Sequence, residues 1–552
     1  MGLFIRKSIE ALQEEAAQTG SRTLKRVLGP VSLVALGVGV IIGAGLFSIT
    51  GTVAAYYAGP SITISFIIAA IGCCFAGLCY AEFASMIPVA GSAYTYSYAT
   101  MGEFIAWIIG WDLVLEYSVA ATTVSISWSR YFTVFLQTIG INLPQAFTAC
   151  PWDGGIINIP AMVIVICMSL ILMRGTAGSS AFNGFIVFLK ITVIAVFIIL
   201  GWKFINTDNY VPYIPENTGT LGEYGISGIF RGAAIVFFAF LGFDAVSTAA
   251  QETKNPRRDM PIGILVSLLV CTLLYILFAY VMTGVAHYTA FKGQEGIAPV
   301  AVAIQHMGTA DASGIIQPAY PWLNKAILIA ILLGYCSVIM VTLLGQSRVF
   351  LSMSHDGLLP PFFSRINEKT RTPIHNNLIF MILVSVLAGI VPASVAGEMT
   401  SIGTLLAFTL VCIGVLIVRK TMPGVHRAFQ TPFVPFVPIM GILTCFCMMV
   451  FLPADTWIRL VVWMLIGLDI YASYGINRSK LEPDVPYRKG NLVLNVTGLT
   501  LSVLCAITGL WHQQTVGWAQ DKTLLIISFV FALAHFAFFL WRMWSKAHAK
   551  VG

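Results

Sequence analysis

Apolar runs of about 20 residues recur along the whole chain, and each could cross the roughly 30 Å hydrocarbon core of a bilayer as a helix. Inside lipid the backbone has no water to bond, so such runs must be helices that pair their own amides and carbonyls. Only 10% of the residues are charged and 58% are hydrophobic, whereas a soluble domain carries about 25% charged residues. We therefore expect an all-α integral membrane protein.

About fourteen such spans can be counted along the sequence. The longest polar gap between them, near residues 287–321, is too short for an independent soluble domain. The segment before Pro30 is polar and charged, so we expect no cleavable signal peptide and a first span that itself directs insertion.

In this fourteen-span arrangement, lysine and arginine are divided unevenly between the two sides of the membrane. With the N-terminus inside, most of the 31 basic residues fall in cytoplasmic segments, as the positive-inside rule requires. We therefore predict a multi-pass protein of the plasma or bacterial inner membrane with both termini cytoplasmic. The net charge of +7 follows from this pattern, so we expect membrane lipids as neighbours and no nucleic-acid partner.

The first span contains a glycine cluster, because residues 37–47 read GVGVIIGAGLF. Each glycine weakens a helix by about 1 kcal/mol relative to alanine. In hydrocarbon this is tolerated only where the freed backbone lines a cavity or packs on protein. Taken alone, this cluster has two equally good interpretations. One is close helix packing, as in Gly39-x-x-x-Gly43, and the other is a functional break.

The sixth span favours the break, because residues 237–244 read FFAFLGFD and place a glycine and a carboxylate near mid-membrane. Two interrupted helices in corresponding positions of two halves indicate an inverted-repeat transporter. Amides freed at such breaks attract a carboxylate, and freed carbonyls accept from an ammonium group. We predict that the backbone of an α-amino acid is bound by Ile42, Gly43, Ala44, Gly45, Phe238, Ala239, Phe240 and Leu241.

These motifs, together with residues 251–261 (QETKNPRRDMP), resemble the amino acid, polyamine and organocation transporters. Residues 110–117 and 347–360 resemble the cationic amino acid transporter branch and its bacterial permeases. The resemblance covers nearly the whole chain and implies a leucine-transporter-like core of two inverted five-helix repeats with four extra transmembrane helices. The corresponding segments are 1–30 (N-terminal), 31–205 (first repeat), 226–420 (second repeat), 434–543 (extra helices) and 544–552 (tail).

Ionisable residues inside spans are costly unless paired or hydrated, and each is a functional candidate. Asp112 and Glu116 share one face of the third span; Asp112 lies nearer the cytoplasm, and we expect it to be solvated. Glu116 is deeper, and two hypotheses stand for it: it carries the coupling proton, or it forms the acidic end of the substrate pocket.

Lys190 lies in the fifth span without a local carboxylate. One hypothesis is an ammonium group fixed on carbonyls of a broken helix with constant charge. The resemblance implies another, because in proton-coupled members a lysine here replaces a sodium ion. We therefore predict a proton as the coupling ion, with no cofactor and no metal; whether Lys190 titrates stays open.

Asp244 follows the second break and is expected to cap the inner half-helix. With Glu252 and Arg257 it also forms a candidate gating network at the inner end. Ordinary loop capping and the positive-inside signal explain Glu252 and Arg257 equally well.

The chain shows no clustered nucleophile, base or metal ligands, so we do not expect an enzyme, and no filter motif of a channel. Ten of the eleven cysteines lie in apolar runs, which leaves Cys150 without a disulfide partner. We predict a secondary active transporter for proton-coupled uptake of L-amino acids, cationic, neutral or both. An exchanger and a transporter-like sensor are the alternatives, and oligomeric partners stay open.

Overall fold

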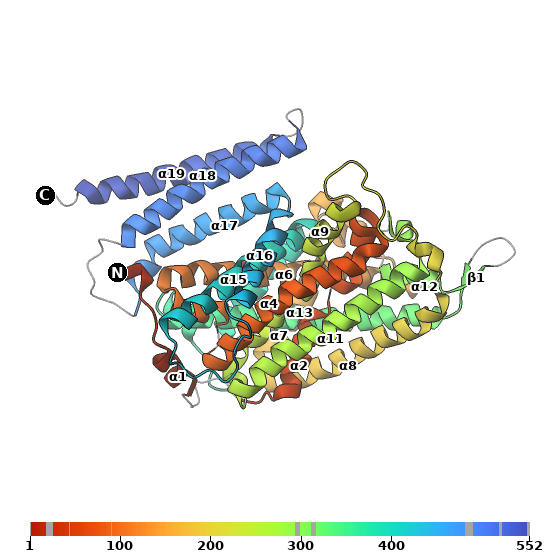
Figure 1. Cartoon of the computed structure of the whole chain (residues 1–552), viewed down its shortest axis with the longest axis horizontal. Helices are drawn as coiled ribbons and strands as arrows, with labels where there is room; N and C mark the ends of the chain where they lie inside the picture. Colours follow the sequence, from red (N-terminus) through yellow and green to blue (C-terminus); the bar gives the residue numbers. More distant parts are fainter. Residues whose placement is uncertain are drawn as a thin grey trace.

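The computed structural model describes residues 2–17, 26–43, 45–89, 91–292, 299–310, 316–480, 490–517 and 522–548. They form a bundle of long helices that run roughly side by side, with a two-stranded hairpin at one end (Figure 1). Ten helical stretches of these residues are long and apolar enough to cross a membrane. Three shorter apolar helices accompany them, namely Ile159–Met173, Ile374–Ile390 and Phe436–Val450.

The first half of the chain contains one candidate stretch of 57 residues, Pro30–Met86. The chain reverses within it at Gly59, whose φ of +60° favours glycine, so this stretch comprises two helical passes. The helices of this half are α1 (Ile9–Ala17), α2 (Pro30–Ile41), α3 (Thr50–Val53), α4 (Ile62–Met86), α5 (Ala93–Thr100), α6 (Glu103–Thr138), α7 (Ile159–Met173) and α8 (Thr176–Gly201).

The second half again begins with an interrupted helix. Its helices are α9 (Gly225–Val236), α10 (Phe243–Thr248), α11 (Pro256–Val285), α12 (Pro299–Gln305), α13 (Pro321–His355), α14 (Ile374–Ile390), α15 (Ala393–Thr421), α16 (Phe436–Val450), α17 (Ala454–Ser473), α18 (Gly490–Val516) and α19 (Thr523–His548). The strands β1 (Gly308–Ala310) and β2 (Ile316–Pro318) pair antiparallel.

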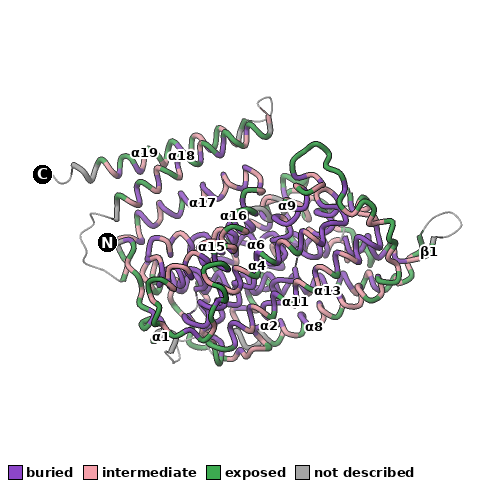
Figure 2. Tube along the Cα trace, viewed as in Figure 1, coloured by how far each residue is buried: buried purple, intermediate pink, exposed green. Residues whose placement is uncertain are grey.

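Burial separates a core from a periphery. In α6 and α13, 89% of the most apolar window is buried, whereas in α19 only 17% is. Figure 2 shows the same division, with buried residues through the middle of the bundle and exposed ones along α18 and α19. Because most of each of these two windows is buried, polar residues within them face protein for the most part.

The two ends of the bundle are defined by the segments that lie there. The backbone amide of Glu103, at the start of α6, donates to the carbonyl of Ile5 (3.1 Å), so α6 begins beside the N-terminal segment. We call this the proximal end; it lies at the left of Figure 1, as does the end of α19. The hairpin of β1 and β2 marks the distal end.

The predicted all-α multi-pass membrane architecture is confirmed by these helices. The total of fourteen crossings, the five-plus-five inverted repeat and the division of the chain into segments stay predictions.

Candidate functional site

The first break lies where the glycine cluster predicts it. The last α-helical bond of α2 joins the amide of Ile42 to the carbonyl of Val38 (3.0 Å), and Ile42 is then extended, with φ −75° and ψ 96°. A wide π-helical turn over Gly45–Ile49 resumes the helix. Ala44 lies outside the described residues. Carbonyls at the end of α2 are therefore free to bond other partners.

The second break follows α9. A short 3-10 turn over Phe237–Phe240 leads to Leu241, which is extended, and to Gly242, whose φ is +110°. A methyl group added to Gly242 would lie 1.9 Å from Cγ1 of Val40 in α2. Both the backbone conformation and this close approach require glycine.

The two breaks touch each other. A methyl group added to Gly45 would lie 2.2 Å from Cα of Ala239, so the two backbones pack directly. Tyr275 of α11 places its hydroxyl oxygen 2.6 Å from the carbonyl oxygen of Ile41 and 2.8 Å from that of Ala239. Its single proton can be donated to either carbonyl. Tyr275 therefore ties the broken helices together at one point.

A cavity of about 30 Å³ lies between the breaks and helices α6 and α13. It is lined by Val40, Ile41, Gly43, Gly45, Glu116, Tyr117, Ala120, Val124, Phe238, Leu241, Gly242, Val338 and Thr342. Of the predicted binding residues, Gly43, Gly45, Phe238 and Leu241 line this cavity, while Ile42, Ala239 and Phe240 do not. A volume of this size accommodates roughly one or two water molecules, so binding of an amino acid requires the cavity to widen.

Lys190 of α8 is fully buried beside the first break. Its ammonium group donates to the carbonyls of Gly39 and Ile42, both at 2.6 Å. Gly334 of α13 makes room for the side chain, because a methyl group there would lie 2.7 Å from Cε of Lys190. No carboxylate of the described residues forms an ion pair with Lys190. This is the geometry of an ammonium group fixed on carbonyls of a broken helix.

Two carboxylates, Glu116 and Asp244, lie on the side of the site opposite Lys190. Glu116 of α6 is 2% exposed and lines it, and its Oε2 atom has no hydrogen-bond partner in the part of the chain that is described. The hydroxyl of Tyr117 donates to Oδ2 of Asp244 (2.5 Å), and the amide of Gly242 donates to Oδ1 (3.2 Å). Asp244 therefore binds a freed amide at the second break, and it does not line the cavity.

Comparison with known proteins decides the family. The sequence profile of the family described as "Amino acid permease" matches residues 28–470. The chain belongs to this amino acid permease family. Its relatives and family support amino acid transport and not an enzymatic activity. The resemblance to the amino acid, polyamine and organocation transporters is thereby confirmed.

Three relatives illustrate the similarity of the permease to known transporters. The branched-chain amino acid permease BcaP of Bacillus subtilis (strain 168) is 44% identical over 87% of this chain and 99% of its own length. A methylthioribose transporter of the same organism is 40% identical over 87% of this chain and 99% of its own length. The vacuolar cationic amino acid transporter 4 of Arabidopsis thaliana is 34% identical over 73% of this chain and 65% of its own length.

At the proximal end of the permease, Glu252 joins three segments. Arg348 of α13 donates to Oε1 of Glu252 through Nε (3.0 Å) and a terminal nitrogen (2.6 Å), and both side chains are at most 2% exposed. The carbonyl of Glu252 accepts from the amides of Val27 and Leu28, at 2.8 and 3.0 Å. Glu252 thus links the segment before α2, the loop after α10 and α13.

Arg257, predicted with Glu252 as a gating residue, is exposed, and no hydrogen bond or ion pair of its side chain is seen among the described residues. The buried ion-pair partner of Glu252 is Arg348. Arg348 lies in a motif of the sequence and was not predicted to be functional, although a charge inside an apolar helix is the same signal that singled out Lys190.

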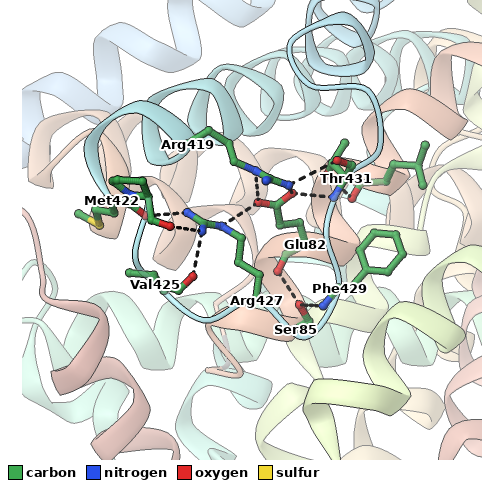
Figure 3. A network of polar contacts seen from close by, with 10 residues as sticks. Glu82, Ser85, Arg419, Met422, Val425, Arg427, Phe429 and Thr431 are labelled. Atoms are coloured by element: carbon green, nitrogen blue, oxygen red, sulfur yellow. Dashed lines mark hydrogen bonds and ion pairs between the residues drawn. The ribbon is translucent and has the colours of Figure 1, made fainter.

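A second polar network closes the proximal end of α4. Figure 3 shows Glu82 held between two arginines from the end of α15 and the loop that follows. Arg419 donates to both carboxylate oxygens at 3.0 Å, and Arg427 lies 3.2 Å from Oε1. The amide of Thr431 also donates to Glu82, at 2.8 Å. These contacts fix the loop after α15 onto α4.

Proposed function

We propose that this permease is a secondary active transporter that takes up L-amino acids together with protons, by alternating access. The observation that carries the proposal is the contact of two helix breaks around a small cavity, which offers free backbone groups to both charged ends of an amino acid. The small cavity volume and the buried Glu252–Arg348 pair support a state closed toward the proximal end.

The lining of the cavity favours substrates with neutral aliphatic side chains. Val40, Ile41, Val124 and Val338 supply apolar walls, and Glu116 is the one charged side chain among the lining residues. The relative named as a branched-chain permease supports the same substrate class. Glu116 would serve instead as counter-ion for a cationic side chain, as the relatives named as cationic transporters suggest.

Lys190 supports coupling to protons rather than sodium. A sodium ion bound beside the first break would need the carbonyl oxygens of Gly39 and Ile42 as ligands, and the ammonium group of Lys190 occupies both. A fixed positive charge there stabilises the break without sodium. Glu116, buried at the cavity with an unpartnered oxygen, is then the group that carries the proton.

In this proposal the proximal end faces the cytoplasm, the chain crosses the membrane fourteen times, and both termini lie inside the plasma or bacterial inner membrane. The ten long stretches, one of which holds two passes, and the three shorter helices are compatible with that number.

Proteoliposomes loaded at neutral pH and diluted into acidic, sodium-free buffer test the function. Labelled leucine should accumulate, choline in place of sodium should change nothing, and a protonophore should abolish accumulation. A panel of unlabelled amino acids then ranks substrates by competition. Strict dependence on sodium would refute the coupling, counterflow without any accumulation would identify an exchanger, and binding without transport would identify a sensor.

A further inference from the structure

Asp112 lies one helical turn from Glu116 toward the proximal end of α6, and it is not solvated. The prediction that it would be solvated is wrong, because its side chain is 0% exposed. Both carboxyl oxygens lack a hydrogen-bond partner within the described ranges. An ionised carboxylate in such surroundings is very costly, so we expect Asp112 to be a neutral acid in this state. α6 starts nine residues earlier, at Glu103, and neighbouring helices cover it at this level.

Space for the carboxyl group is made by a glycine on α15. A methyl group added to Gly403 would lie 3.0 Å from Oδ1 and 3.7 Å from Oδ2 of Asp112. The carboxyl group is therefore held against bare backbone, with little room to move. Glu116 stands four residues further along α6, about 6 Å along the axis and on the same face. The Thr404 hydroxyl of α15 lies beside its carboxyl group.

Other charged groups around this pair are already engaged. On α10, Asp244 is bonded by Tyr117 and the amide of Gly242. On α17, which stacks Trp463 on Trp111 at 4.6 Å, Arg459 pairs with Asp455. Arg348 pairs with Glu252, Asp469 with His535 and Arg419 with Glu82, and Glu103 accepts from Tyr98 and Tyr471. The other cationic or imidazole side chains described on the packed helices, Lys325, His355, His375 and Lys420, are exposed. The buried hydroxyl of Tyr80 has no hydrogen-bond partner among the described residues. None of the described cations pairs with Asp112 or Glu116.

Two buried carboxyl groups lie on one face of α6: Glu116 at the cavity, with one oxygen that lacks a hydrogen-bond partner, and Asp112 one turn nearer the proximal end, with both oxygens lacking one within the described ranges. From this geometry we infer that Asp112 is a proton-relay residue, which takes the transported proton from Glu116 and delivers it toward the proximal side. The inference rests on the proposed proton-coupled function.

The relay balances one proton in each cycle. When the proximal end opens and water reaches Asp112, its carboxyl group releases its proton to that side. Glu116 then passes its own proton to the Asp112 carboxylate, so Asp112 is neutral again and Glu116 is ionised. Glu116 is reprotonated from the distal side when the cavity opens there. One proton has then crossed with each substrate, and both groups have returned to their starting state.

The test compares net accumulation with exchange in proteoliposomes. For a one-proton symporter, a gradient of about one pH unit supports about tenfold accumulation. Asp112→Asn keeps the shape of a neutral acid but cannot release a proton. We expect accumulation of labelled leucine to fall from about tenfold to about onefold, because the gradient of one pH unit no longer drives leucine transport. Counterflow, which needs no net proton movement, should persist, and Asp112→Glu should restore accumulation.

Normal accumulation by Asp112→Asn would overturn the relay and leave a neutral acid that only packs α6 against α15. If both Asp112 variants fail to fold, infrared difference spectra of the wild type replace them. Leucine should then change a carboxylic C=O band that shifts on ¹³C-aspartate labelling and persists in Asp244→Asn; an unchanged band overturns the relay. A wild type that does not accumulate leucine under a proton gradient refutes the proposed function itself, which this design separates from failure of the relay.

Discussion

Gly45→Ala should uncouple the two breaks while leaving the rest of the bundle intact. Its methyl group would lie 2.2 Å from Cα of Ala239, whereas ordinary contacts begin at 3.4 Å. Subtracting 2.2 Å from 3.4 Å, the two backbones must separate by about 1.2 Å. Overpacking of this kind typically costs about 1–3 kcal/mol. If this cost falls on the substrate-bound state, it corresponds to roughly a 5- to 150-fold loss of affinity.

Gly184→Ala in α8 is the matched control, because nothing lies within 4 Å of a methyl group added there. Both variants are purified, their melting temperatures are compared, and leucine affinity is measured by competition for counterflow. We expect weakened affinity in Gly45→Ala and wild-type affinity in Gly184→Ala. Unchanged affinity in a folded Gly45→Ala protein would show that contact between the breaks does not shape the substrate site.

Three further variants test the charges around the site. Lys190→Met removes two charge-assisted hydrogen bonds worth about 1.5–3 kcal/mol each; we expect a lower melting temperature and lost uptake, and normal values would show that the ammonium group does not hold the first break. Glu116→Gln should abolish pH-driven accumulation and preserve counterflow if it carries the proton, whereas selective loss of cationic substrates would identify a pocket residue. Glu252→Gln leaves the buried Arg348 without its carboxylate, and breaking a buried ion pair destabilises a protein by about 3–5 kcal/mol. Cysteines placed at the proximal end should then become more reactive toward a water-soluble thiol reagent. Unchanged reactivity would exclude a gate there.

The breaks were predictable because glycine and charge inside an apolar span conflict with a continuous helix. Residues 37–47 and 237–244 carry that conflict in their own composition. Lys190 was found by the same criterion, and its bonds to the carbonyls of Gly39 and Ile42 follow from the need to pair a buried ammonium group. Local chemistry of this kind can be detected without knowing which helices are neighbours.

What depends on neighbouring helices was missed or wrong. Tyr275 joins the two breaks, yet a lone tyrosine in an apolar helix gives no signal. Asp112 was expected to be solvated from its place along the third span, but α15 and α17 cover α6 there. Glu252 was grouped with Asp244 and Arg257 as a candidate gate, which stays a prediction; its ion-pair partner Arg348 lies 96 residues away in the sequence and was missed.

The central claim is that the two breaks bind the charged groups of an amino acid backbone. Calorimetric titration of the purified permease with leucine, with leucinol, which lacks the carboxylate, and with N-acetylleucine, which lacks the ammonium group, tests it most directly. Because a hydrogen bond to a charged group contributes about 1.5–3 kcal/mol, each analogue should bind roughly 10- to 150-fold more weakly than leucine. Equal affinity of leucine and both analogues would contradict the claim.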